Sequence, residues 1–145
     1  MQHDELIGKV QALAQLPSRG SAEQATRAVL TTLAERVPPG LADHLAAQLP
    51  PTLATAITSA TTASQEAVHG RLSGGHGERF DLVTFTGRVA GRAGTTEDSA
   101  IRESTAVLEV LDAAVTPELM EKVAEALPAD IRELLPSSRA DEPEA

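Results

Sequence analysis

The stretch that decides the fold is SAEQATRAVLTTLAERVPPGLADHLAAQLP, residues 21–50. Its apolar residues recur at helical spacing on both sides of Pro38-Pro39-Gly40, which predicts two amphipathic helices joined at a proline corner. The same pattern returns as SAIRESTAVLEVLDAAVTPELMEKVAEALP, residues 99–128. When the two stretches are aligned, the following residues coincide: Ala28-Val29-Leu30 with Ala106-Val107-Leu108, Leu33 with Leu111, Val37 with Val115, Pro39 with Pro117, and Leu49-Pro50 with Leu127-Pro128. This repetition predicts two copies of one helical unit.

The repeat predicts an all-α protein in which two pseudo-symmetric units of three to four helices form one compact helical bundle. The expected parts are unit one at 1–72, a Gly-rich linker loop at 73–79, unit two at 80–136, and a disordered acidic tail at 137–145. Duplicated units of this size bury their apolar faces on each other, so neither half is expected to be stable alone.

In the first unit, a helix is expected over residues 4–15, and Pro17, Ser18 and Gly20 are expected to end it. Its predicted buried face consists of Leu6, Val10 and Leu13. Ser21 is the predicted cap of the next helix, because Gln24 completes a capping box. The residues of that helix expected to remain in solvent are Arg27, Glu35 and Arg36. A short helix after Pro50 and a separate weak helix from Thr58 to Gly70 complete the unit.

In the second unit, Asp81 is the expected cap of a first helix that buries Phe85 and Val89. The long helix that follows is expected to bury a stripe made of Ile101, Thr105, Leu108, Leu111 and Val115. Thr116 and Pro117 are typical of a helix start. A short last helix after Pro128 is expected to bury Ile131, Leu134 and Leu135.

Composition narrows the classes of function. The 145 residues include no Cys, Trp or Tyr and two Phe, so the core must be aliphatic, and disulfide or thiolate chemistry is excluded. The formal net charge is −9, and residues 85–145 carry thirteen acidic against six basic side chains. An acidic chain repels phosphate backbones, so nucleic acid is not an expected partner. The acidic start and the lack of a long apolar run favour a cytoplasmic protein.

The order of these elements resembles the bacterial DUF2267 family. The resemblance rests on Ala25–Leu30, Leu33–Gly40 and Leu45–Pro50 in the first copy, and on Phe80-Asp81, Phe85, Val89 and Leu127-Pro128 in the second. It covers residues 4–136 and implies a small all-helical protein without an assigned activity. The second copy departs from the pattern at Val115–Glu118, which changes a helix start but not the fold.

Three motifs contain residue types that can form a chemical site, but none of them predicts one. Glu66 and His69 have the spacing of di-iron bundles, but those need further ligands on facing helices. Glu118, Glu121 and Glu125 share one helix side and are expected to form an exposed acidic stripe. The glycine-rich 73–77 segment lacks the strand and Lys of a phosphate loop, so it is interpreted as linker. No catalytic residue, metal or cofactor is therefore expected.

Small residues mark the back of the first helix in each copy: Gly8 and Ala12 in one, and Gly87 and Gly91 in the other. Residues four apart lie one above the other on a helix, so each pair forms a small patch. We expect this face to pack against another helix, either where the two first helices cross or in a second subunit. The alternative is that these glycines are exposed and merely tolerated.

The expected function is a non-enzymatic interaction or regulatory module that acts through helix surfaces or the groove between the copies. An exposed apolar groove would be its structural sign. The alternative is an enzyme or small-ligand-binding protein with its pocket between the units, which needs polar groups converging on a concave site. The expected partner is a protein, for which a second copy qualifies; neither nucleic acid nor membrane is expected.

Overall fold

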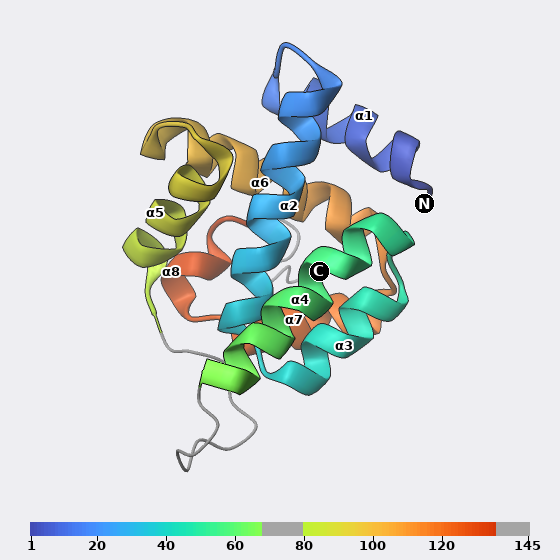
Figure 1. Ribbon diagram of the computed structural model, residues 1–145, viewed down its shortest axis with the longest axis vertical. Helices are drawn as coiled ribbons and strands as arrows, with labels where there is room; N and C mark the ends of the chain where they lie inside the picture. Colours follow the sequence, from blue (N-terminus) through green and yellow to red (C-terminus); the bar gives the residue numbers. More distant parts are fainter. Residues whose placement is uncertain (68–79, 136–145) are drawn as a thin grey trace, which may run out of the picture.

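The computed structural model describes residues 1–67 and 80–135, and helices form all the regular structure in these ranges (Figure 1). The helices are α1 (His3–Ala14), α2 (Arg19–Arg36), α3 (Pro39–Ala47), α4 (Pro51–Ala67), α5 (Leu82–Ala93), α6 (Glu97–Ala114), α7 (Pro117–Ala126) and α8 (Ala129–Arg132). The all-α prediction is confirmed. The predicted linker 73–79 and tail 137–145 lie outside the described residues.

The two long helices, α2 and α6, form the centre of the molecule. They pack on each other, and α1 and α5 each pack on both of them. α4 lies against α2 and α3, while α3 also meets α7, and α8 lies against α5 (Figure 1). Three helices of the first half, α1, α2 and α3, therefore pack on helices of the second half, which agrees with one shared core.

Helix lengths follow the predicted repeat in three of four positions. α1 and α5 have 12 residues each, α2 and α6 have 18 each, and α3 and α7 have 9 and 10. The fourth helices differ, because α4 has 17 residues and α8 has 4. The predicted pseudo-symmetry of the complete units stays a prediction.

Local chemistry sets several helix boundaries. The side chains of Asp81, Thr96 and Thr116 each accept a hydrogen bond from the backbone N–H three residues later, which confirms the caps predicted at Asp81 and Thr116. Val37 ends α2 and Pro39 opens α3, as the proline corner predicts. Gly94 ends α5 in the left-handed region, with φ 69°, where glycine has no steric penalty.

Two predicted boundaries are wrong. Ser18 caps α2, because its Oγ accepts a hydrogen bond from the Ser21 backbone N–H at 3.1 Å, so the cap lies three residues before the predicted one. Gly20 therefore lies in the first turn of α2 instead of separating α1 from α2. Residues 51–67 form one helix, not two. Within it, the Thr58 and Thr61 hydroxyls donate hydrogen bonds to carbonyl groups of the preceding turn, so both residues are accommodated inside the helix.

Apart from Phe85, the core is aliphatic, as composition requires. Its largest fully buried side chains include Phe85, Leu33, Leu45, Leu108 and Ile131. Ile101 is not among them and is exposed, so its predicted burial is wrong. α6 instead buries Ala100, Ser104 and Leu108, because its core stripe is rotated away from Ile101. Within the described residues, no helix has the length and apolar character needed to cross a membrane.

Candidate functional site

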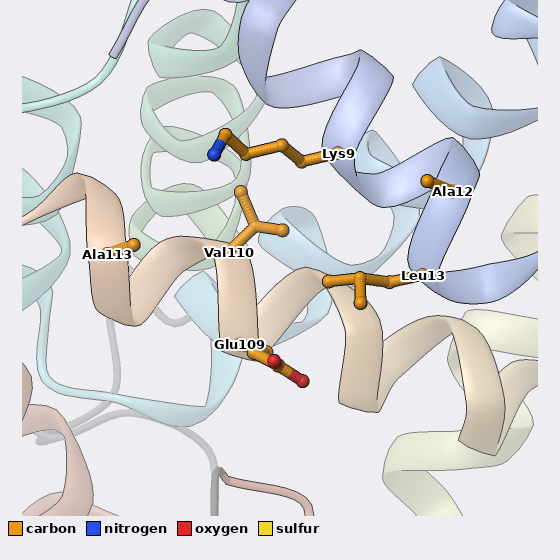
Figure 2. A pocket seen from close by; sticks show the side chains of 6 residues that line it. All are labelled: Lys9, Ala12, Leu13, Glu109, Val110 and Ala113. Carbon is orange, nitrogen blue, oxygen red and sulfur yellow. The ribbon is translucent and has the colours of Figure 1, made fainter.

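An open groove of about 340 Å³ lies between α1 and α6 (Figure 2). Its lining residues are Lys9, Ala12 and Leu13 from α1, and Glu109, Val110 and Ala113 from α6. Four of the six are aliphatic, and the two charged residues are at its edges. Because α1 belongs to the first half of the chain and α6 to the second, the groove lies between the two predicted units.

Leu13 gives the groove its apolar character, because its side chain is 46% exposed. Its predicted burial is wrong for a geometric reason. The buried stripe of α1 runs through Ile7, Val10 and Ala14, and Leu13 lies at the edge of this stripe. A large aliphatic side chain in solvent beside Val110 is the kind of surface that a partner covers.

Lys9 and Glu109 carry opposite charges on opposite sides of Val110 (Figure 2). Both side chains are exposed. Within the described part of the chain, neither makes a hydrogen bond or an ion pair. The groove therefore has an apolar middle with one unpaired cation and one unpaired anion at its edges.

A second polar feature joins α2 to α5. Arg92 donates from Nη2 to Glu35 Oε2 at 2.6 Å and from Nη1 to Glu35 Oε1 at 2.9 Å. Arg88 Nη1 donates to the same Oε1 at 2.9 Å, and Thr32 Oγ1 accepts from Arg92 Nη1 at 2.9 Å. Glu35 is 13% exposed, so its predicted position in solvent is wrong. The missed signal is that Arg88 and Arg92, four residues apart, share one helix face.

The segment before α5 is held by the same cluster. The Arg88 guanidinium lies 4.2 Å from the centroid of the Phe80 ring, a cation–π contact. Arg36 Nε donates to the Phe80 carbonyl at 3.0 Å, and Asp130 Oδ2 accepts from the Leu82 backbone N–H at 2.9 Å. These groups bind one another, so the cluster is a structural junction between the halves and not an open site.

Glu103, in the middle of α6, is 5% exposed, and among the described residues it is the only acidic side chain that is buried. Its Oε1 atom has no hydrogen-bond partner there. Burial raises the pKa of the Glu103 carboxyl, and the neighbouring Arg102 charge lowers it in part. Glu103 does not line the groove, so its carboxyl is a stability feature and not part of the candidate site.

The predicted small-residue face is half-buried or exposed within the chain. A Cβ added at Gly8 would come within 4 Å only of Arg19 Nη1, at 3.7 Å, and one at Gly87 only of Glu97 Oε2, at 3.9 Å. A Cβ at Gly91 would meet nothing within 4 Å, and Ala12 is exposed at the groove. The two first helices thus do not cross at these glycines among the described residues; packing of this face against a second copy stays a prediction.

The other motifs supply no chemistry in the described part of the chain. His69 and 73–77 lie outside it, as does the Glu66 side chain. Glu118, Glu121 and Glu125 are exposed, as predicted. In the described ranges, no group of three or more His, Cys, Asp or Glu side chains could hold a metal ion.

Together, the helices and the groove define a small all-helical protein with an open apolar surface between its two halves. The chain belongs to the family described as "Uncharacterized conserved protein (DUF2267)", whose sequence model matches residues 3–134. This match confirms the resemblance drawn from the repeated helices and proline corners. No curated protein matches the chain.

Proposed function

We propose that this protein is a non-enzymatic interaction or regulatory module of the cytoplasm that binds a protein partner in the groove between α1 and α6. The observation that supports the proposal is the exposed Leu13 side chain beside Val110, at the junction of the two halves. Complete burial of a leucine contributes roughly 1.5–3 kcal/mol, and because Leu13 is 46% exposed, a partner that covers it gains about half of that range.

The polar groups of the groove favour a protein over a small substrate. An active site needs polar groups that converge on one point and differ in protonation behaviour. Here the two charged groups, Lys9 and Glu109, are exposed and lie on opposite sides of an apolar middle. An apolar centre with a charged rim is the usual anatomy of a protein interface.

The absence of cysteine makes the proposal straightforward to test, because a single introduced cysteine can carry a photo-crosslinker. Ala113→Cys places the crosslinker in the groove, and Ala47→Cys places it on an exposed position of α3 as the matched control. We expect a protein adduct from position 113, none from position 47, and loss of the adduct when Leu13→Asp is added to the Ala113→Cys chain.

Two results would contradict the proposal. Equal adducts from both positions would show that the groove is not the binding surface. If position 113 captures no protein from cells in which the chain is expressed, a protein-binding role for the groove is wrong, and small-ligand binding between the units becomes the better hypothesis.

A further inference from the structure

We propose that the partner in the α1–α6 groove is a second copy of this chain, in a twofold dimer in which Lys9 of each copy faces Glu109 of the other. The inference rests on the proposed function, because it names the partner of the same groove. A twofold interface uses the same patch on both subunits, so the patch must be complementary to itself.

The charges of the groove meet this requirement. Lys9 and Glu109 lie on opposite sides of Val110 and have no partner in the described part of the chain (Figure 2). A twofold axis that lies in the plane of the interface, midway between Lys9 and Glu109 and perpendicular to the line joining them, brings Lys9 of one copy onto Glu109 of the other, and the reverse. One symmetry operation therefore satisfies both charges, whereas an unrelated partner would need an acid and a base at the same separation.

The apolar middle fits the same arrangement. Leu13 is half-exposed, and the flanking Ala12 and Ala113 have short side chains, so a second α1–α6 surface can approach closely. The Leu13 side chain of each copy then packs in the groove of the other copy. In such an interface, aliphatic contact supplies affinity, while the edge charges determine orientation and reject wrong partners.

The net charge sets the conditions for the measurement. Each copy carries a formal charge of −9, so two copies repel at long range. At an ionic strength of about 0.15 M the Debye length is about 8 Å, which screens this repulsion but leaves a direct Lys–Glu contact largely intact. Association should therefore be measured near this salt concentration, and not at low salt.

The test is a charge exchange followed by sedimentation velocity over a range of protein concentrations. We expect a concentration-dependent dimer for the unchanged chain. Lys9→Glu and Glu109→Lys each place like charges at both contacts and should weaken dimerisation by roughly tenfold or more. When the two variants are mixed in equal amounts, opposite charges meet again, and the mixture should recover the affinity of the unchanged chain to within about threefold.

Two controls keep the result interpretable. Lys9 and Glu109 are exposed, so both variants should retain the helical circular dichroism of the unchanged chain. Exchange of two exposed charges that do not line the groove, Glu118→Lys and Lys122→Glu, should leave dimerisation within about twofold.

The proposal is overturned if the unchanged chain stays monomeric up to about 1 mM, a weak limit for specific association. It is also overturned if the mixture of charge variants remains monomeric, because the contact would then involve other residues. A monomeric chain whose position-113 crosslinker still captures a different protein keeps the proposed function and rejects the second copy. Failure of both experiments rejects both proposals.

Discussion

The Glu35 junction should contribute measurably to stability, and Glu35→Gln is the substitution that tests this. The carboxylate accepts three hydrogen bonds from Arg88 and Arg92, at 2.6–2.9 Å, and is 13% exposed. Glutamine keeps the shape and one acceptor oxygen, but it removes the charge and turns an N–H₂ group towards a guanidinium.

The expected size of the effect follows from these contacts. A hydrogen bond to a charged group contributes roughly 1.5–3 kcal/mol, but bonds that share one carboxylate are not additive. The two arginines are about a third exposed, so solvent screens part of the interaction. We therefore expect Glu35→Gln to lower the free energy of unfolding by about 1–3 kcal/mol.

The measurement is urea unfolding followed by far-ultraviolet circular dichroism, since the chain has no Trp or Tyr to report by fluorescence. The matched control is Glu23→Gln, which removes the Arg27–Glu23 pair within α2, where Glu23 is 38% exposed. Such exposed pairs contribute roughly 0.3–0.5 kcal/mol. Equal midpoint shifts for the two variants would refute the claim that the junction stabilises the packing of α5 on α2.

Four further outcomes are expected. Gly91→Ala should raise the free energy of unfolding by roughly 0.4–1 kcal/mol, because its Cβ meets nothing within 4 Å; a lowered urea midpoint would contradict this. Glu103→Gln should gain stability relative to the unchanged chain as pH rises from about 4 to 7. The sign follows from the raised pKa of Glu103, because the folded state binds the carboxyl proton more tightly than the unfolded state. Ionisation of Glu103 therefore lowers the free energy of unfolding at pH values above 4.5, the ordinary pKa of a glutamate. Parallel curves of stability against pH for the two chains would refute this prediction. Ser18→Ala should cost roughly 0.5–2 kcal/mol and Ser21→Ala less, since Ser18 is the cap; the reverse order of urea midpoints would contradict the assignment. Residues 1–72 alone should unfold without a cooperative transition, because α1 and α2 pack on α5 and α6; a sharp thermal transition would show an independent domain.

Features that depend on neighbouring residues could be predicted from the sequence. The caps at Asp81 and Thr116 and the turn before Pro39 use groups within a few positions of one another, so local chemistry decides them. The same reasoning misplaced the cap of α2, because Ser18 and Ser21 both suit the role and only the three-dimensional contact selects Ser18.

Features that depend on distant residues could not be predicted in this way. Periodicity places Leu13 and Ile101 near the core side of their helices, but each lies at the edge of its stripe, where the position of the neighbouring helix decides burial. Glu35 is mostly covered, at 13% exposure, only because α5 brings Arg88 and Arg92 to it. The groove likewise requires α1 and α6 to be adjacent, which no pattern within either helix specifies.

The packing of α1 on α6 cannot form until most of the chain has been synthesised. The hydrogen bond from Arg102 Nε to the Ala14 carbonyl joins residues 88 positions apart. Ribosomes add roughly 5–20 residues per second, so α1 leaves the exit tunnel several seconds before α6, on which it packs in the complete fold. During that interval α1 lacks its packing on α6, so we expect its apolar side chains, among them Ile7 and Val10, to present a surface to which chaperones can bind.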